Sequence, residues 1–461
     1  MIFKDTTGKR WILIKFSFLI ILILFLTALI THQLHLNKII DFPFIKSIAT
    51  HIFEVLGKVF VAYLFISIVI GFLRMFIIFF FAIQHKLREK VVNEMKKLND
   101  NICIKYEPTV SILIPVYNEA VVIRKTIESI LKSDYPITEI LVIDDGSTDN
   151  TAAIVKKRFA YQPIVKLITK KNSGKSAALN TGITMAVGEI IITIDADTVF
   201  TKSTITHLVG YFSDSKVAAV SGNCKIGNIV NQLSLWQHIE YVTSNNLDKR
   251  AFDVLQCISV VPGSNSAWRK RVVQNLGYYH YDTLAEDAEL TLRILNNGYK
   301  VIYDDRAISF EECPETVRSF IKQRVRWSYG ILQVAWKHKK NIIRSSNKAL
   351  KYFAIPSMLF SYLLFLTSPL IDIIFIFSLI SGTKSVYLFA LLFYFTDFLN
   401  SLVAFKLGNE NMKPLIWVFI QRLAYRYLLA FVTWKALLMA LKGRRVGWNK
   451  LIRSGNNANK T

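Results

Sequence analysis

The sequence is poor in cysteine and lacks the spacings that would use cysteine as a metal ligand. Its four cysteines lie far apart, and no C-x-x-C pair occurs. We therefore expect reduced residues of a protein core rather than a disulfide framework or a zinc site. These residues are Cys103, Cys224, Cys257 and Cys313.

Two common nucleotide-binding signatures are also missing. Gly174-Lys175-Ser176 looks like the end of a P-loop, but the first glycine of that motif would stand at position 169, which is Thr169. No G-x-G-x-x-G follows the first predicted strand, 109–115, so a dinucleotide-binding fold has no fingerprint. Backbone N–H groups at the start of the 176–187 helix, together with Lys175, could still meet an anion. A helix cap with a solvated lysine is the alternative.

Acidic residues are few relative to basic ones. The chain has 57 lysines and arginines against 33 aspartates and glutamates, a net charge of +24. The basic residues gather beside apolar runs, which fits anchoring at an anionic cytoplasmic membrane surface better than a nucleic-acid interface. We therefore expect membrane lipids as partners and no nucleic acid. Examples are Lys4, Lys9, Arg10, Lys442, Arg444, Arg445 and Lys450.

Long apolar runs divide the chain into three parts. The run 11–30 is too long for a removed signal peptide and has no small-residue cleavage site, so we expect a membrane span. A second span is expected at 59–81, interrupted only by Arg74. Residues 1–100 are thus predicted to form an N-terminal membrane region with two transmembrane helices. Residues 101–340 then form a cytosolic domain that ends in an interfacial basic helix.

Residues 341–461 are predicted to form a second membrane region with two or three transmembrane helices and a basic tail. The runs 352–380 and 386–405 are expected spans, and their prolines and acids could line a polymer path or join helices. The run 414–441 is long enough to span but contains Arg422 and Arg426. Because a fifth crossing would place the basic tail outside, we favour four crossings and an interfacial helix at 414–441.

The middle of the chain alternates strand and helix patterns. This alternation, with short loops, predicts an α/β domain with a doubly wound, mostly parallel sheet that binds ligands at the carboxyl ends of its strands. The predicted strands are 109–115, 139–143, 164–168 and 190–194, and the predicted helices are 119–132, 151–159 and 176–187.

Three polar clusters fall at such strand ends. They are Tyr117-Asn118-Glu119, Asp144-Asp145-Gly146-Ser147 and Asp195-Ala196-Asp197. In an extended chain, Asp195 and Asp197 point to the same side, and two carboxylates about 5 Å apart repel by roughly 3 kcal/mol at an effective dielectric of about 20. A divalent cation between them would remove that repulsion and attract a phosphate. An acidic turn is the alternative for this motif alone.

Two later motifs allow a structural or a chemical interpretation. Glu286 and Asp287 open a predicted helix, where acids usually stabilise the first turn, but a carboxylate there could also act as a general base. The segment from Gln323 through Arg326 to Trp327 could be a basic amphipathic helix at the membrane surface. Alternatively, its arginine would stabilise a diphosphate leaving group and its indole would stack on a sugar.

Taken in order, these motifs resemble those of the membrane-bound processive glycosyltransferases of family 2. That family includes poly-N-acetylglucosamine, hyaluronan, chitin and cellulose synthases, and the chain most resembles the first of these. The resemblance covers roughly residues 109–340 with the flanking membrane segments, and it implies a cytosolic GT-A domain flanked by transmembrane helices. The motifs are Ile114-Pro115-Val116-Tyr117-Asn118-Glu119, Asp144 to Asp149, Gly174-Lys175 with Ala178-Leu179-Asn180, Asp195-Ala196-Asp197, Ala285-Glu286-Asp287 and Gln323 to Trp327.

The resemblance implies how the donor is bound. Asp145 would contact the uracil of a UDP-sugar, with Tyr117 and Glu119 close by and Lys175 near the nucleotide.

The resemblance also implies a metal and a base. Asp195 and Asp197 would hold Mg²⁺ or Mn²⁺ against the diphosphate, with Asp197 as the more direct ligand. Asp287 would deprotonate the acceptor hydroxyl, with Glu286 beside it in the substrate site. Many relatives have threonine where this chain has Ala285, a departure that bears on the subfamily and substrate rather than on the reaction.

Gln323, Arg326 and Trp327 would close over the diphosphate and the acceptor sugar. The implied reaction is an inverting transfer of a sugar, with N-acetylglucosamine as our best guess, from a UDP-sugar to a growing β-linked polysaccharide that then passes across the cell (inner) membrane. An accessory export protein is a further expected partner.

Other functions stay open from the sequence. These are a non-processive glycosyltransferase that makes a glycolipid, a hyaluronan- or cellulose-type synthase, and a transporter or scaffold with a degenerate nucleotide fold. The intact Asp195, Asp197 and Asp287 disfavour the last of these.

Overall fold

The computed structural model describes residues 43–99, 106–380, 384–443, 453 and 455. The predicted membrane span 11–30 and Cys103 lie outside the described residues. The other three cysteines are free and buried, which confirms their prediction as reduced core residues.

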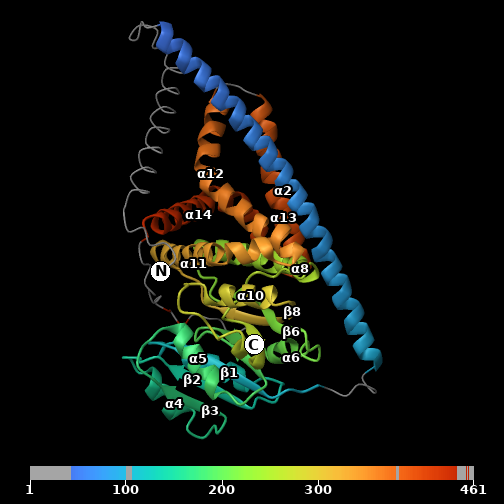
Figure 1. Ribbon diagram of the computed structural model, residues 1–461, viewed down its shortest axis with the longest axis vertical. Helices are drawn as coiled ribbons and strands as arrows, with labels where there is room; N and C mark the ends of the chain where they lie inside the picture. The colour runs from blue at the N-terminus through green and yellow to red at the C-terminus, as the bar shows by residue number, and fades with distance from the viewer. Residues whose placement is uncertain (1–42, 100–105, 381–383, 444–452, 454, 456–461) are drawn as a thin grey trace.

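An eight-stranded sheet forms the centre of the middle part of the chain (Figure 1). Its order is β3-β2-β1-β4-β7-β6-β8-β5. The strands are β1 (Val110–Val116), β2 (Glu139–Asp144), β3 (Val165–Thr169), β4 (Ile190–Thr193), β5 (Val199–Phe200), β6 (Val217–Ile226), β7 (Ser266–Arg269) and β8 (Lys300–Glu311). Shorter helices connect them: α3 (Ile123–Leu131), α4 (Thr151–Arg158), α5 (Lys175–Met185), α6 (Thr204–Val209), α7 (Gln232–Glu240), η1 (Tyr241–Asn246), α8 (Leu247–Val254), α9 (Lys270–Asn275) and α10 (Glu286–Asn296).

The half of the sheet built from β1 to β4 confirms the predicted doubly wound arrangement. β1 pairs in parallel with β2 and β4, and β2 pairs in parallel with β3. Alternate residues of β1 enter two separate cores: Leu113 packs with α5 and α10 on one face, whereas Ile112 and Ile114 pack with α3 on the other. The continuous apolar runs of these strands follow from this burial on both faces.

The other half of the sheet is mixed and has no counterpart in the predicted strands. β7 runs antiparallel to both β4 and β6, β5 runs antiparallel to β8, and β6 and β8 are parallel. The predicted helix 119–132 begins later, at Ile123, because the Glu119 carbonyl accepts turn hydrogen bonds from the Val122 and Ile123 amides at 3.1 and 3.0 Å.

Five long helices and two short ones, η2 and η3, make up most of the rest of the described chain. They are α2 (Pro43–Asn99), α11 (Val317–Arg344), η2 (Leu350–Ala354), α12 (Ile355–Ile380), α13 (Lys384–Leu407), η3 (Lys413–Trp417) and α14 (Val418–Leu441). Among the described residues, three segments are long and apolar enough to cross a membrane: Ala62–Val91, Leu350–Pro369 and Lys413–Leu441. The expected span 386–405 is also helical, as part of α13.

Helix α2 continues well past the span predicted at 59–81. Its 57 residues run diagonally from the α12 and α13 region down to the sheet domain (Figure 1). Large apolar side chains such as Phe76 and Phe80 are exposed along it, as expected of a lipid-facing helix. Helices α11 and α14 pack side by side between the sheet and the upper parts of α12 and α13 (Figure 1). Because 413–441 could span by length and composition, its interfacial position stays a prediction.

Candidate active site

A cavity of about 350 Å³ opens at the carboxyl ends of β1, β2 and β4. It brings together seven of the predicted site residues from separate motifs. These are Tyr117, Glu119, Asp145, Lys175, Asp195, Asp197 and Arg326. The remaining wall includes Asn172, Gly174 and, from the C-terminal tail, Arg453.

The loops after β1 and β2 are locked together at the cavity edge. Asn118 adopts a left-handed backbone conformation with φ of 56°, which asparagine tolerates better than most residues. Its side-chain oxygen accepts a hydrogen bond from the Thr148 amide at 2.6 Å, and its own amide donates to Ser147 Oγ at 2.9 Å. These bonds fix the positions of Tyr117 and Glu119 on either side of Asn118.

Asp145 anchors the loop that leads into α5. Its carboxylate accepts hydrogen bonds from the amides of Ser173 at 3.0 Å and Gly174 at 2.7 Å, and it pairs with Lys170 Nζ at 2.7 Å. Gly174 has φ of +93°, a conformation that favours glycine and turns its N–H toward Asp145. The predicted uracil contact of Asp145 stays a prediction, and the structure adds this anchoring role.

Lys175 lies between two predicted motifs. Its amine pairs with Asp195 Oδ1 at 2.5 Å and lies 3.8 Å from Glu286 Oε1. Burial alone would lower the pKa of Lys175, but the charges of Asp195 and Glu286 raise it above its ordinary value. Burial raises the pKa of the Glu286 carboxyl, with Lys175 opposing that shift. Lys175 is therefore a fixed cation that joins the strand-end aspartate to the start of α10.

Asp197 has a different cation partner, which the sequence interpretation missed. Its Oδ2 lies 2.6 Å from Arg453 Nη2, and its side chain is only 6% exposed. Burial raises the pKa of Asp197, and the charge of Arg453 opposes that shift. For Arg453, burial lowers the pKa, but the charge of Asp197 raises it, and the net effect is an increase. We predicted only that the basic tail lies at the membrane surface, and no local pattern around Arg453 connects it to a strand end more than two hundred residues earlier.

Asp287 lies next to the cavity rather than in its wall. Its Oδ2 accepts a long hydrogen bond from the Gly263 amide at 3.3 Å, and its Oδ1 accepts from the Ala288 amide at 2.8 Å. A Cβ on Gly263 would lie 3.0 Å from Lys175 Nζ, so glycine allows this loop to pass between Asp287 and Lys175. Asp287 is therefore close to the ion-paired residues.

The α11 motif divides between the cavity and the protein interior. Arg326 lines the cavity, whereas Gln323 is buried and Trp327 packs against a cluster that includes Tyr241 and Cys313. Arg324, to which we assigned no role, pairs with Glu240 at 2.6 Å and lies 4.4 Å from the Trp327 ring centre. It holds α11 against α7 and orients Trp327.

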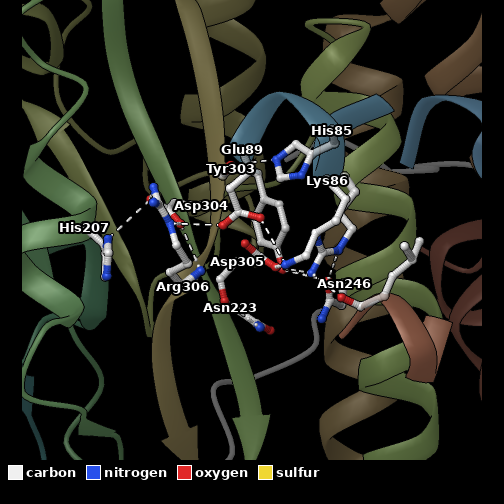
Figure 2. Close-up of polar contacts among 12 residues, drawn as sticks. His85, Lys86, Glu89, His207, Asn223, Asn246, Tyr303, Asp304, Asp305 and Arg306 are labelled. Carbon is white, nitrogen blue, oxygen red and sulfur yellow. Dashed lines mark hydrogen bonds and ion pairs between the residues drawn. The ribbon is translucent and has the colours of Figure 1, made fainter. Parts of the chain in front are cut away.

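A second acidic group lies away from this cavity, where α2 meets β8. Ligand atoms of Glu89, Asp304 and Asp305 lie within 4.8 Å of one another (Figure 2). Lys86 lies 3.1 Å from Glu89, Arg306 lies 2.7 Å from Asp304, and Arg250 pairs with Asp305. Three cations thus face three carboxylates. These ion pairs connect α2, β8 and α8, and we call the group the charge-balanced joint.

Most of the residues that line this cavity lie in a stretch that matches a known protein family. Residues 111–277 match the family described as "Glycosyl transferase family 2". The chain contains a family 2 glycosyltransferase domain. The predicted resemblance to family 2 glycosyltransferases and the predicted α/β fold of this domain are thereby confirmed.

Curated relatives extend the comparison beyond the glycosyltransferase domain. The chain is 33% identical to "Probable glycosyltransferase YdaM" of Bacillus subtilis over 57% of its own length and 64% of that protein. It is also 33% identical to "Poly-beta-1,6-N-acetyl-D-glucosamine synthase" of Staphylococcus epidermidis over 51% of its own length and 58% of that protein. The chain thus spans less than two thirds of the length of these relatives.

Among solved structures, the chain is similar to a mannosyltransferase from Pyrobaculum calidifontis in complex with GDP-Man and Mn²⁺. The identity is 19% and the TM-score 0.49, over 81% of this chain and 100% of that one.

Proposed function

We propose that this protein is an inverting, processive glycosyltransferase that adds N-acetylglucosamine from a UDP-sugar to a β-linked polysaccharide. The observation that carries the proposal is the cavity in the family 2 domain, where the strand-end acids, Lys175 and Arg326 meet next to Asp287. The similarity to poly-β-1,6-N-acetylglucosamine synthases supports the choice of sugar.

Donor binding would use the wall of the cavity. Tyr117 supplies an aromatic face and Asp145 a carboxylate at the inner wall, which suit a nucleobase. Arg326, also in the wall, supplies a guanidinium for the diphosphate. Burial lowers the pKa of Arg326, while nearby Glu286 and Asp195 oppose that shift.

The residues of the strand-end motif fit a divalent cation. Asp195 and Asp197 offer carboxylate oxygens in one cavity, and Mg²⁺ and Mn²⁺ prefer oxygen ligands of this type. Each of the two carboxylates already pairs with a cationic side chain. When bound, the cation would neutralise the negative charge that develops on the departing diphosphate. Lys175 keeps Asp195 oriented toward the same space.

Asp287 would act as the general base. Its carboxylate accepts the proton of the acceptor hydroxyl while the hydroxyl oxygen forms a bond to the anomeric carbon. The bond from that carbon to the diphosphate oxygen breaks, and UDP departs with the electron pair. A single in-line displacement inverts the α-linked donor to a β-linked product. Glu286 is held by Lys175 and would position the start of α10 beside the acceptor.

The segments that are long and apolar enough to cross a membrane support a membrane location for this reaction. We propose that the glycosyltransferase domain is cytosolic in a multi-pass inner-membrane protein, with residues 1–100 and 341–461 forming the membrane regions. The growing polymer would leave across the membrane, together with an accessory export protein.

The test is to incubate membranes that contain the protein with a panel of radiolabelled UDP-sugars and to size the product. We expect label from UDP-N-acetylglucosamine in a high-molecular-weight polymer that a β-N-acetylglucosaminidase degrades. Label in a short, lipid-extractable product would instead identify a non-processive enzyme, and label from another sugar alone would refute the proposed donor. Activity should stop with a chelator and return with Mg²⁺ or Mn²⁺.

A further inference from the structure

The two aspartates of the strand-end motif are neutralised by cations from very different parts of the chain. Asp195 pairs with Lys175 of α5 at 2.5 Å, whereas Asp197 pairs with Arg453 of the C-terminal tail at 2.6 Å. These two ion pairs therefore place two cationic side chains on the two aspartates. A divalent cation bound to both aspartates would add two positive charges, and departure of one cationic side chain would remove one of them.

Lys175 cannot readily move away from Asp195 to admit a metal ion. It is the first residue of α5, a helix packed in one of the two cores, and its amine also lies 3.8 Å from Glu286. Moving that amine would leave both Asp195 and Glu286 without it, and removing one partner from a buried charge cluster is costly.

Arg453, by contrast, lies in no helix or strand. Beyond Asp197, its Nη1 donates to the Glu312 carbonyl at 2.9 Å. Two residues later, the Gly455 carbonyl accepts a hydrogen bond from Lys125 Nζ of α3 at 2.6 Å. A Cβ on Gly455 would lie 2.9 Å from Val121 Cγ1, so the tail passes close to the surface of the domain there.

We propose that Arg453 is a built-in counter-ion that occupies the metal position at Asp197, so that the tail arginine and the divalent cation bind there in competition. This inference rests on the proposed metal role of Asp195 and Asp197. Arg453 pairs with the buried Asp197 carboxylate in the metal-free protein, and it weakens the binding of a metal ion that arrives without a nucleotide. Arg453 thereby regulates how readily the donor site is loaded.

The experiment is a Mn²⁺ titration of the detergent-solubilised full-length protein, with free Mn²⁺ measured by electron paramagnetic resonance and no sugar nucleotide added. We expect Arg453→Ala to bind Mn²⁺ roughly tenfold more tightly than the wild type, equivalent to about 1.4 kcal/mol. Lys125→Ala leaves the arginine in place but removes the Gly455 contact, and it should tighten binding in the same direction by a smaller factor.

Arg124→Ala is the matched control, because Arg124 neighbours Lys125 on α3 and its side chain is 58% exposed beside Glu128. It loses one positive charge without touching the tail and should bind Mn²⁺ as the wild type does. Equal tightening in Arg124→Ala and Lys125→Ala would overturn the proposal, since it would show a general charge effect.

Asp197→Asn separates this inference from the proposed function. If Mn²⁺ binding is lost in Asp197→Asn but unchanged or weaker in Arg453→Ala, the metal site stands and the competition is refuted. If neither the wild type nor Arg453→Ala binds Mn²⁺ while circular dichroism shows folded protein, both the metal assignment and the competition are refuted.

Discussion

At the scale of single residues, the candidate active site combines ion-paired carboxylates with one that is not ion-paired. Among the described residues, no cation lies within salt-bridge distance of Asp287. Lys175 and Arg453 hold the strand-end aspartates, whereas Asp287 accepts hydrogen bonds from the amides of Gly263 and Ala288. A carboxylate held by amides keeps its orientation and can still accept a proton from an acceptor hydroxyl. This arrangement distinguishes the proposed base from the proposed metal ligands.

Asp287→Asn should therefore abolish transfer without loss of nucleotide binding. We expect the rate to fall by roughly 10²–10⁴-fold, because asparagine keeps the shape but cannot take the proton. Transfer from the labelled donor and UDP binding by calorimetry would be measured on the same preparation. Asp282→Asn is the control, since Asp282 is 45% exposed and pairs with Lys337. Loss of UDP binding together with transfer would contradict the base assignment.

At the scale of elements, a buried carboxylate joins the helix of the proposed base to the long helix α11. Glu289 of α10 is fully buried and lies 3.0 Å from His338 and 2.9 Å from Lys337, both on α11. Arg293 of α10 lies 2.8 Å from it. Burial alone would raise the pKa of Glu289, but hydrogen bonds from His338 and Lys337 and the charge of Arg293 hold it well below its ordinary range.

Glu289→Gln should destabilise the protein by about 3–5 kcal/mol at neutral pH, because it leaves the partly buried Arg293 and Lys337 without their carboxylate partner. A lowered pKa means that the unfolded chain binds the proton more readily than the folded protein does. The contribution of Glu289 is therefore complete above the unfolded pKa of about 4.3 and is lost as the pH falls toward the folded value.

The measurement is thermal unfolding of the wild type and Glu289→Gln from about pH 7 down to about pH 3; the difference should persist down to about pH 4.3 and narrow below it. Glu128→Gln is the control, because Glu128 pairs at the surface with Arg158, whose side chain is 60% exposed, and its loss should cost about 0–1 kcal/mol. A gap between wild type and Glu289→Gln that widens in acid would contradict the lowered pKa.

At the scale of the whole molecule, α2 contacts both another long apolar helix, α12, and the sheet domain. Arg74 pairs with Asp248 of α8 at 2.6 Å and donates to Ser357 of α12 at 2.6 Å. Closer to its end, α2 contributes Lys86 and Glu89 to the charge-balanced joint with β8 (Figure 2). Arg74, the charged residue that interrupts the second apolar run, thus links α2 to α8 and α12.

A double-mutant cycle tests this contact. Arg74→Met and Asp248→Asn should each destabilise the protein, and the double variant should lose less than the sum, with a coupling of about 0.5–3 kcal/mol. Unfolding in detergent would be followed by near-ultraviolet circular dichroism. The exposed pair Arg158 and Glu128 provides the comparison cycle, with an expected coupling of about 0.2–1 kcal/mol. Strict additivity at Arg74 and Asp248 would show that the contact does not join α2 and α8.

The sequence alone determined the features that depend on residues close together in the chain, namely the buried strands and the polar residues at their ends. The apolar runs of β1, β2 and β4 predict strands buried on both faces, and a polar residue just after each run must then lie at the same sheet edge. Tyr117, Asp145 and Asp195 were predicted to meet for this reason, and all three line the cavity. The order of these local motifs carries the resemblance to family 2 glycosyltransferases, and residues 111–277 match that family.

Only the tertiary structure decided which distant charges neutralise one another. The mixed half of the sheet, from β5 to β8, lacks the regular strand and helix alternation that identifies parallel units. The pairing of Lys175 with Glu286, and of Arg453 with Asp197, depends on how loops and the tail fold back over the sheet. A basic side chain suits a membrane surface and a buried carboxylate equally well, so its partner is set by packing rather than by sequence pattern.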